Sequence, residues 1–190
     1  MADSRDLIEK IKAGETDSFQ SLVKEYKRLV YNIVFRMVQN DADREDICQD
    51  VFVKVYQNLA GFQHESKLST WIGRIAFNAC VNCLTKKKVP LYDDYSAEGD
   101  SIENFIGEAK PPDDFTAEKD IANRLETEMS KLPAQLRTIL TLYHVEEMSY
   151  AEIAKIMNMP DGTIKSYLFR ARKMLKQRLM KKYHAEELWP

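Results

Sequence analysis

Long apolar runs are missing from this sequence, and their absence excludes two classes of protein. No stretch of 18 or more apolar residues occurs, so we expect no direct insertion into a membrane. The first residues, MADSRDLIEKIKAGE, carry charges where a secretory signal peptide needs an apolar centre. We therefore expect a soluble, cytoplasmic protein, with the packed cores that a hydrophobic fraction of 44% allows.

Cysteine and histidine are scarce as well. Three cysteines are an odd number without the spacing of a disulfide framework, which fits a reducing compartment. Cys80 and Cys83 form a C-x-x-C, but no second pair and no paired histidines accompany them, so we interpret both as buried residues rather than as a zinc site or a redox sensor. The sequence also lacks paired catalytic acids, a nucleophile with its base and a phosphate-cradling glycine loop. We expect no metal, no cofactor, no small-molecule substrate and no enzymatic activity.

The net charge of -2 is small, but acidic and basic residues are unevenly distributed along the chain. Residues 1–84 carry 11 bases and 12 acids, residues 85–120 carry 5 and 10, and residues 121–190 carry 12 and 8. The acidic middle part also holds three of the six prolines and no sustained apolar period, which is typical of a flexible connection. This distribution predicts two small domains, at residues 1–88 and 117–190, joined by an acidic linker at residues 89–116. The basic last part is expected to meet a polyanion.

Apolar residues recur at helical spacing in both predicted domains and nowhere alternate with period two, which predicts an all-α fold. The first domain reads as a bundle of helices, the fourth of which Ser69 or Thr70 can cap. In the second domain, Ser149 and Glu152 have the spacing of a capping box, and NMPDG then breaks the helix before another begins. Two helices joined by a tight turn after a supporting helix predict a helix-turn-helix.

The last helix has two distinct faces. Its apolar residues, spaced by three and four, predict an inward face at Ile164, Leu168, Ala171, Leu175 and Leu179. The opposite face carries Lys165, Ser166, Phe169, Arg170 and Lys173. In a helix-turn-helix this outward face enters the major groove of DNA, whereas Arg172 and Lys176 would mostly meet phosphate or solvent. The alternative is a merely solvated basic surface.

The first domain carries a second polar strip, formed by Arg74, Asn78 and Asn82 at successive intervals of four along the fourth helix. The strip follows the loop HESK and lies beside Phe62 and Trp71. Amides and bases near aromatic rings suit single-stranded DNA, whose unstacked bases need stacking surfaces and polar pockets. The alternative is that Trp71 and its neighbours belong to the core.

The chain resembles, in two segments, the extracytoplasmic-function sigma factors, which are alternative initiation subunits of bacterial RNA polymerase. The segments are DREDICQDVFVKVYQNLAGFQHESKLSTWIGRIAFNAC and LPAQLRTILTLYHVEEMSYAEIAKIMNMPDGTIKSYLFRARKML, separated by the acidic spacer. The resemblance implies that the first domain binds the clamp helices of the core polymerase and opens the -10 promoter element. It implies that the second domain reads the -35 element in promoter DNA.

The resemblance also implies roles for individual positions. Those that match the core-binding helix are Asp46, Gln49, Asp50 and Phe52. Those that match the -10 loop and the helix behind it are His64, Glu65, Ser66, Lys67, Leu68, Trp71, Arg74 and Asn78. Those that match the -35 reading face are Lys165, Ser166, Phe169 and Arg170, beside which Lys173 lies on the same outward face.

Some positions depart from the family pattern, and all of them fall at the -10 contacts. Asn82 stands where an aspartate is common, KKK replaces an arginine pair, and HES replaces an acidic and glycine-rich loop. These departures leave the promoter sequence open.

Partners and rival functions follow from the same features. The resemblance implies an anti-sigma factor, often membrane-anchored, which would hold the chain at the membrane only indirectly. A net charge of -2 predicts weak binding to free DNA, and hence dependence on the polymerase. The rivals are a stand-alone helix-turn-helix regulator, usually a dimer on a palindromic site, and a helical adaptor that binds protein through its acidic faces.

Overall fold

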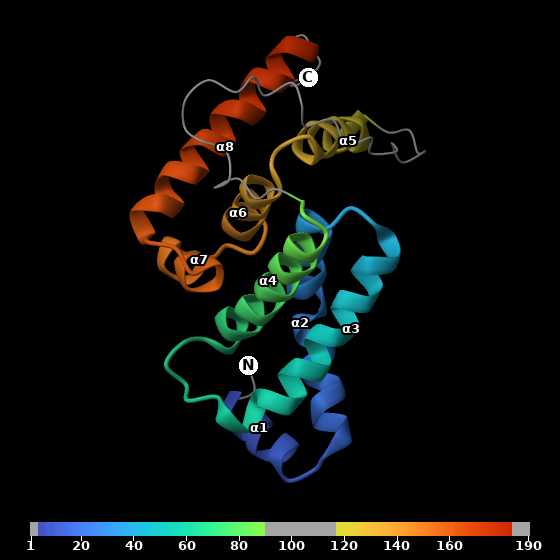
Figure 1. The fold of residues 1–190 in the computed structure, drawn as a ribbon, viewed down its shortest axis with the longest axis vertical. Coiled ribbons are helices and arrows are strands. Elements are labelled where there is room, and N and C mark those ends of the chain that lie inside the picture. The colour runs from blue at the N-terminus through green and yellow to red at the C-terminus, as the bar shows by residue number, and fades with distance from the viewer. Residues whose placement is uncertain (1–3, 90–116, 184–190) are drawn as a thin grey trace.

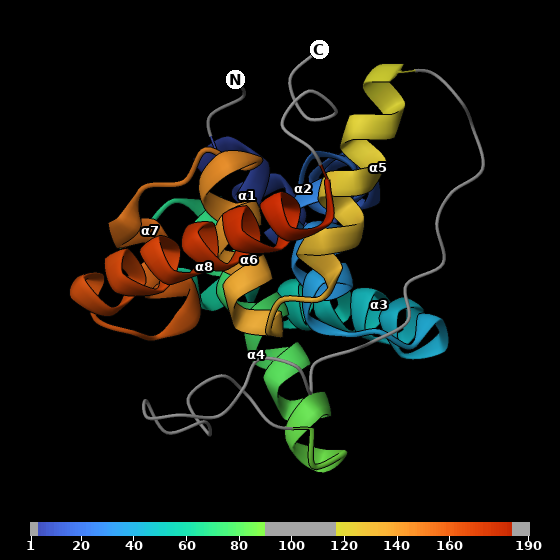
Figure 2. The same ribbon diagram turned by 90° about the horizontal axis from the view of Figure 1, so that it is seen from above.

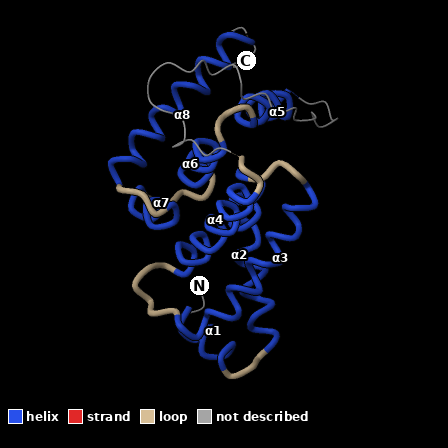
Figure 3. The backbone as a smooth tube through the Cα atoms, viewed as in Figure 1, coloured by secondary structure: helices blue, strands red, loops and turns tan. Residues whose placement is uncertain are grey.

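The computed structural model describes residues 4–89 and 117–183, and within them every regular element is helical (Figures 1 and 3). This confirms the predicted all-α fold. The predicted linker, residues 89–116, lies outside the described residues except for Val89. The helices are α1 (Ser4–Lys12), α2 (Thr16–Met37), α3 (Asp41–Asn58), the short 3₁₀ helix η1 (Leu59–Gly61), α4 (Leu68–Lys86), α5 (Ala117–Ser130), α6 (Ala134–His144), α7 (Tyr150–Met157) and α8 (Asp161–Lys182).

Helices α1 to α4 form the amino-terminal half, in which α2 and α4 supply most of the core. The buried positions of α2 follow the helical spacing that the sequence predicts, and they are Leu22, Leu29, Val30, Ile33, Val34 and Met37. On α3, Asn40 caps the first turn by accepting a hydrogen bond from the backbone N–H of Asp43 at 3.0 Å.

The expected cap of α4 is wrong. The helix begins at Leu68, after an N-cap at Lys67 whose side chain makes no capping bond, so Ser69 and Thr70 lie inside the first turn. Leu68 is only 4% exposed, and its burial anchors this turn in place of a polar cap. Thr70 is buried too, and its hydroxyl has no hydrogen-bond partner in the part of the chain that the structure describes.

Helices α5 to α8 form the carboxy-terminal half. The predicted capping box at the start of α7 is confirmed, because Ser149 Oγ accepts from the Glu152 N–H while Glu152 Oε2 accepts from the Ser149 N–H at 2.9 Å. Asn158 ends α7 in the left-handed region with φ of 55°, which turns the chain sharply into α8. The two helices therefore form the tight turn of a helix-turn-helix, with α6 as their support.

The two halves pack directly on each other, α2 against α6 and α4 against α7 (Figures 1 and 2). We call this contact the seam. A methyl group added at Gly73 of α4 would lie 2.9 Å from Ile156 Cδ1 of α7, so the glycine permits the close approach of the two helices. Buried apolar residues from both halves form one continuous core.

Polar side chains complete the seam. Asn32 Nδ2 donates to Glu146 Oε1 at 2.7 Å, and Arg137 Nε donates to the carbonyl of Arg36 at 2.7 Å. Arg137 is 6% exposed, and its burial, together with nearby Arg36 and Arg44, lowers its pKa to about 10. The guanidinium therefore stays charged at neutral pH and ties α6 to the end of α2.

Candidate functional site

The outward face of α8 carries all five residues that the sequence assigns to it. Lys165, Ser166, Phe169, Arg170 and Lys173 are exposed, and Phe169 is 68% exposed although it is a large apolar residue. The inward residues Ile164, Leu168 and Ala171 are buried. Because core packing fixes the rotation of the helix, the five outward side chains form one line of guanidinium, ammonium, hydroxyl and aromatic groups. Groups of these kinds can contact base edges.

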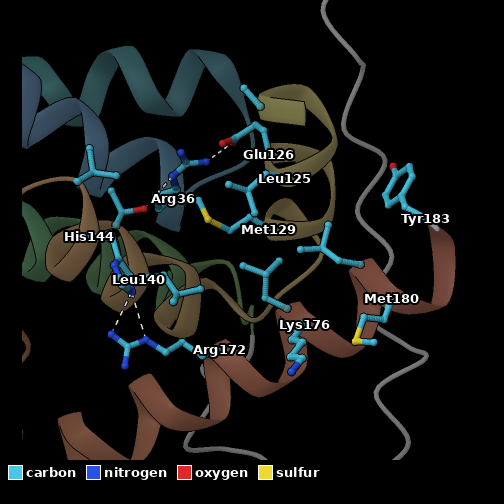
Figure 4. Close-up of a pocket in the computed structure, with 15 residues that line it drawn as sticks. Arg36, Leu125, Glu126, Met129, Leu140, His144, Arg172, Lys176, Met180 and Tyr183 are labelled. Carbon is cyan, nitrogen blue, oxygen red and sulfur yellow. Dashed lines mark hydrogen bonds and ion pairs between the residues drawn. The ribbon is translucent and has the colours of Figure 1, made fainter. Parts of the chain in front are cut away.

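Arg172, which is predicted to meet phosphate or solvent, is exposed, and its guanidinium turns toward α6. Its Nε donates to His144 Nε2 at 3.2 Å (Figure 4). Its guanidinium lies 5.0 Å from the ring centroid of Tyr143. Burial and the neighbouring Arg172 lower the pKa of His144, so the imidazole is neutral at physiological pH and accepts this bond. No sequence pattern pairs these residues, which lie on different helices.

The polar strip on α4 lines a groove of about 440 Å³ between α4 and α3. Trp71, Arg74 and Asn78 are brought together there with Asn82. Lys54 and Asn58 of α3 complete the opposite wall, and neither is among the predicted site residues. The resulting groove combines an aromatic ring, two cations and three amides, which suits an unstacked base and its phosphate.

The loop before α4 is partly engaged. His64 has a left-handed backbone with φ of 57°, and its ring centroid lies 4.7 Å from that of Phe62. Lys67 Nζ lies 2.8 Å from Glu152 Oε1 on α7, an ion pair across the seam. Glu65 is exposed and Ser66 half-buried, whereas Leu68 points into the core. Four of the five predicted loop positions thus reach the surface, and Leu68 does not.

The Lys67 ion pair has a clear electrostatic effect on Glu152. Hydrogen bonding by Lys67, with the bonds from the Ser149 hydroxyl and backbone, lowers the pKa of Glu152 to about 2 against the opposing effect of burial. The carboxylate that closes the capping box of α7 is therefore the same one that holds the loop before α4.

The predicted core-binding positions lie on α3. Asp46, Gln49 and Asp50 are exposed, and Phe52 is half-buried. Asp46 and Asp50 line a second groove of about 450 Å³ with Lys86 and other residues at the end of α4. This groove shares Lys54 and Asn82 with the first one, so the acidic positions and the polar strip adjoin.

An apolar patch adjoins Phe52 and lies outside the predicted site residues. Val53 and Tyr56 are 52% and 55% exposed, and Tyr56 packs edge-to-face on Phe19 with ring centroids 4.9 Å apart. The sequence does carry a pattern that could have indicated these two residues, because both follow Gln49 at helical spacing. Exposed apolar groups beside polar ones are typical of protein-binding surfaces.

A larger groove of about 1030 Å³ lies between α5, α6 and α8 (Figure 4). Its walls are mainly apolar, and Leu125, Val145 and Met180 are 42%, 49% and 64% exposed there. Arg36 bridges the rim by an ion pair with Glu126. Exposed apolar walls of this kind are typical of protein-binding surfaces.

The burial predicted for both cysteines of the C-x-x-C is confirmed for Cys80 and wrong for Cys83, which lines the groove beside Asp46 and Asp50. Cys80 is fully buried, Cys48 is buried and Cys83 is half-buried. Burial raises the pKa of Cys80 to about 12 and that of Cys48 to about 11, so both are protonated thiols at neutral pH. The described residues hold no cluster of three or more metal-ligating side chains.

Among the helices that the structure describes, none combines the length and apolar character that crossing a bilayer requires.

Comparison with known proteins gives matches over both halves. Two family descriptions match, "Sigma-70 region 2" at residues 22–89 and "Sigma-70, region 4" at residues 122–175. The ECF RNA polymerase sigma factor SigW of Bacillus subtilis is 32% identical over 176 residues, which cover 90% of this chain and 94% of that protein. The ECF RNA polymerase sigma-E factor of Escherichia coli K12 is 32% identical over 173 residues, which cover 89% and 90%.

Two solved structures share the fold. CnrH, in complex with the cytosolic domain of CnrY, matches with a TM-score of 0.64 at 21% identity, covering 94% of this chain and 98% of that one. The sigma factor RpoE of Bartonella quintana, in complex with the anti-sigma factor NepR, matches with a TM-score of 0.64 at 20% identity, covering 88% and 100%.

Proposed function

This chain belongs to the extracytoplasmic-function sigma factors and directs transcription initiation as an alternative sigma factor; we propose that its two halves divide the reading of the promoter. Residues 1–88 would bind the polymerase core and the melted -10 element, and residues 117–190 would read the -35 element as duplex. The observation that carries the proposal is the presence of two different DNA-compatible surfaces on one chain, the outward face of α8 and the α4 groove.

On α8 the proposed -35 readers are Lys165, Ser166, Phe169, Arg170 and Lys173. In a helix-turn-helix the second helix enters the major groove, where Lys or Arg pairs with guanine and an apolar ring contacts the thymine methyl group. The exposure of Phe169, at 68%, supports this role, because an apolar ring costs free energy in water and gains it against a methyl group.

At the -10 element the proposed contacts are His64, Glu65, Ser66, Lys67 and Leu68 in the loop, with Trp71, Arg74 and Asn78 on α4. The exposed loop residues and the α4 groove would hold bases that have left the duplex, which stabilises the melted promoter. Leu68 would act by anchoring the loop rather than by touching DNA, because it is 4% exposed.

For the polymerase, the proposed contacts are Asp46, Gln49, Asp50 and Phe52 on α3, which would bind the clamp helices of the core enzyme. The exposed Val53 and Tyr56 extend this surface with apolar area. Sigma factors are initiation factors rather than enzymes, and the catalysis belongs to the polymerase. A net charge of -2 supports dependence on that partner, because few phosphates are neutralised by the chain alone.

An anti-sigma factor is the proposed regulator. Both structural neighbours were solved with such a partner or with a cytosolic domain of another protein, and the apolar groove between α5, α6 and α8 supports a partner here. A membrane-anchored partner would hold this otherwise cytoplasmic chain at the membrane. The rival functions, a stand-alone regulator or a helical adaptor, give no account of matches to both sigma regions.

The test is reconstitution of the chain with core polymerase and transcription from a promoter library. We expect a defined -10 and -35 pair to be enriched among the transcripts. Asn78→Ala should lower open-complex formation about fivefold to tenfold, because the complex loses about one buried hydrogen bond. A premelted -10 element should restore open-complex formation. Gln20→Ala, an exposed change on α2, is the control. Transcripts without promoter preference, or tight specific binding by the chain without the core enzyme, would contradict the proposal.

A further inference from the structure

The large groove between α5, α6 and α8 combines apolar walls with cations along its α8 side (Figure 4). Leu125 of α5 and Val145, the C-cap of α6, are 42% and 49% exposed there. Arg172 and Lys176 of α8 line the same groove, and both are exposed. The groove therefore suits a segment that carries apolar and acidic side chains together.

The charge of Lys176 has no counter-charge in the part of the chain that the structure describes. Arg36 is paired with Glu126 across the rim, and Arg172 binds the ring of His144. The ion pairs that α8 makes with carboxylates come from residues nearer its end and leave Lys176 out. An exposed ammonium group beside apolar walls favours an acidic occupant.

The chain leaves α8 at the mouth of this groove. Tyr183 is the C-cap, and its extended backbone, with φ of -125° and ψ of 143°, ends the helical path after Lys182. Its side chain lines the groove, and the guanidinium of Arg124 on α5 lies 5.1 Å from its ring centroid. The last described residue thus packs toward α5, so the chain that follows it begins at the groove.

The seven residues that follow Tyr183 have the composition that the groove requires. They read HAEELWP, lie outside the described residues, and are called the tail below. Two are acids, Glu186 and Glu187, two are large apolar residues, Leu188 and Trp189, and none is Lys or Arg. The tail is therefore complementary to a groove with apolar walls and positive charge.

The tail is also long enough to cover the groove. The groove residues on α8 run from Arg172 to Tyr183, eleven positions apart, or about 16.5 Å at about 1.5 Å per helical residue. The six residues from Tyr183 to Trp189 span up to about 20 Å when extended, at about 3.3 Å each. In a tail that runs back along α8, Glu186 comes about 10 Å from Tyr183, level with Lys176, which is about 10.5 Å from it along the helix.

We propose that the tail, residues 184–190, folds back into the groove between α5, α6 and α8, with its two apolar side chains on the walls and its two acids beside Lys176. A segment tethered at the mouth of its own site acts at an effective concentration of about millimolar order, so it binds even when its intrinsic affinity is weak. The tail thereby covers the exposed apolar walls in the free protein. A protein that uses the same groove must displace it, whichever promoter the chain reads.

The experiment places a photoreactive side chain in the tail of the whole chain, by Trp189→p-benzoylphenylalanine, and maps the cross-links by mass spectrometry. We expect cross-links within one molecule on Leu125, Val145 or their neighbours in the groove, at a yield independent of protein concentration. The same substitution at Lys181, an exposed position of α8 outside the groove, is the control and should not mark these residues.

Substitutions in the groove test the chemistry of docking. Val145→Asp should lower the cross-link yield about fivefold, since it places an unpaired charge against the apolar side chains of the tail. Val53→Asp, at a similarly exposed apolar residue of α3, is the matched control and should leave the yield unchanged. Lys176→Glu should lower the yield as well, and changing both Glu186 and Glu187 to Lys in the same chain should restore part of it.

Three outcomes would overturn the docked tail. Cross-links between two molecules, with a yield that rises with protein concentration, would show that a second copy occupies the groove. Cross-links on other surfaces, or none within the chain, would show that the groove is left to a separate partner protein. A yield that neither Val145→Asp nor Lys176→Glu changes would show that the tail does not bind these walls. Because the first map is made on a chain whose groove is unaltered, it tests the docking even if a groove variant fails to fold.

Discussion

The two surfaces proposed to meet DNA differ in how far the protein itself already engages them. On α8 the residues of the outward face are exposed, and Phe169 is 68% exposed. On the loop before α4, Lys67 is paired with Glu152 of α7, and Gly73 farther along α4 packs against Ile156. One surface is thus exposed to solvent, while the other is partly held by the opposite half of the chain.

This difference bears on how both promoter elements can be read together. Their positions, -10 and -35, lie about 25 base pairs apart, or about 85 Å of duplex at about 3.4 Å per base pair. Lys67 and Glu152, by contrast, are in contact at 2.8 Å. If both proposed surfaces bind their elements at once, the seam opens. Substitutions of the residues that close the seam therefore test most directly whether the two surfaces differ in this way.

The largest effect is expected at Arg137, which ties α6 to the end of α2. Arg137→Ala removes bonds to the carbonyls of Arg36 and Ser130 and leaves these acceptors unpaired in a buried place. We expect a loss of about 2 to 4 kcal/mol in unfolding free energy, since hydrogen bonds to charged groups contribute about 1.5 to 3 kcal/mol each and relief of a buried charge offsets part of the cost. Urea denaturation measures it.

The matched control for Arg137→Ala is Arg28→Ala, which removes a cation of the same seam that is 73% exposed in its pair with Glu146. That change should cost less than about 1 kcal/mol, as exposed ion pairs do. Equal losses for the two variants would contradict the assignment of Arg137 as the buried polar tie.

A smaller effect is expected at Glu152, where pH supplies a second readout. Its pKa of about 2 in the folded chain lies below the ordinary 4.5, so the unfolded chain binds more protons between these values. The stabilisation is complete above about pH 4.5 and is lost as pH falls toward about 2. Glu152→Gln should cost about 1 to 2 kcal/mol at neutral pH, from the cap and the ion pair together.

The measurement for Glu152→Gln is the unfolding free energy as a function of pH. The variant should lose less stability than the wild type between about pH 4.5 and about pH 2. Glu147→Gln, at an exposed carboxylate of the preceding loop, is the control and should keep the wild-type slope. Parallel curves for wild type and Glu152→Gln would show that the ion pair across the seam does not stabilise the folded chain.

The contrast between the surfaces also marks how much the sequence could predict. Periodicity gives both faces of α8, and the spacing of Ser149 and Glu152 gives the capping box, because these features depend on neighbours within one or two turns. The ion pair of Lys67 with Glu152 and the turn of Arg172 toward His144 join residues of different helices. Such pairs depend on how helices pack, which no local pattern contains.

The start of α4 is a second place where a local sequence pattern does not predict the structure. Local propensity favours Ser69 or Thr70 as the cap, but the N-cap is Lys67, two or three residues earlier, and the buried Leu68 is the first residue of the helix. Packing therefore overrides the capping preference. The buried position of Leu68 also changes the candidate site. Leu68 anchors the loop in the core, whereas the other predicted loop residues reach the surface.

The smallest change in stability is expected at Phe169, on the open surface. Because the side chain is 68% exposed, Phe169→Ala should alter the unfolding free energy by less than about 0.5 kcal/mol. It should nevertheless weaken holoenzyme binding to the -35 element by about 1 kcal/mol, through the lost contact with a thymine methyl group. Met180→Ala, another exposed apolar residue of α8 at 64%, is the control and should affect neither quantity.

Uracil in place of thymine makes the test of Phe169 specific, because it removes only the methyl group. Each -35 thymine is replaced singly, and affinity is measured for the wild type and for Phe169→Ala. At the contacted position the replacement should weaken the wild type and leave Phe169→Ala unchanged, since the variant has already lost the contact. If the two losses add at every position, the ring does not read a methyl group, and α8 meets DNA through its polar residues alone.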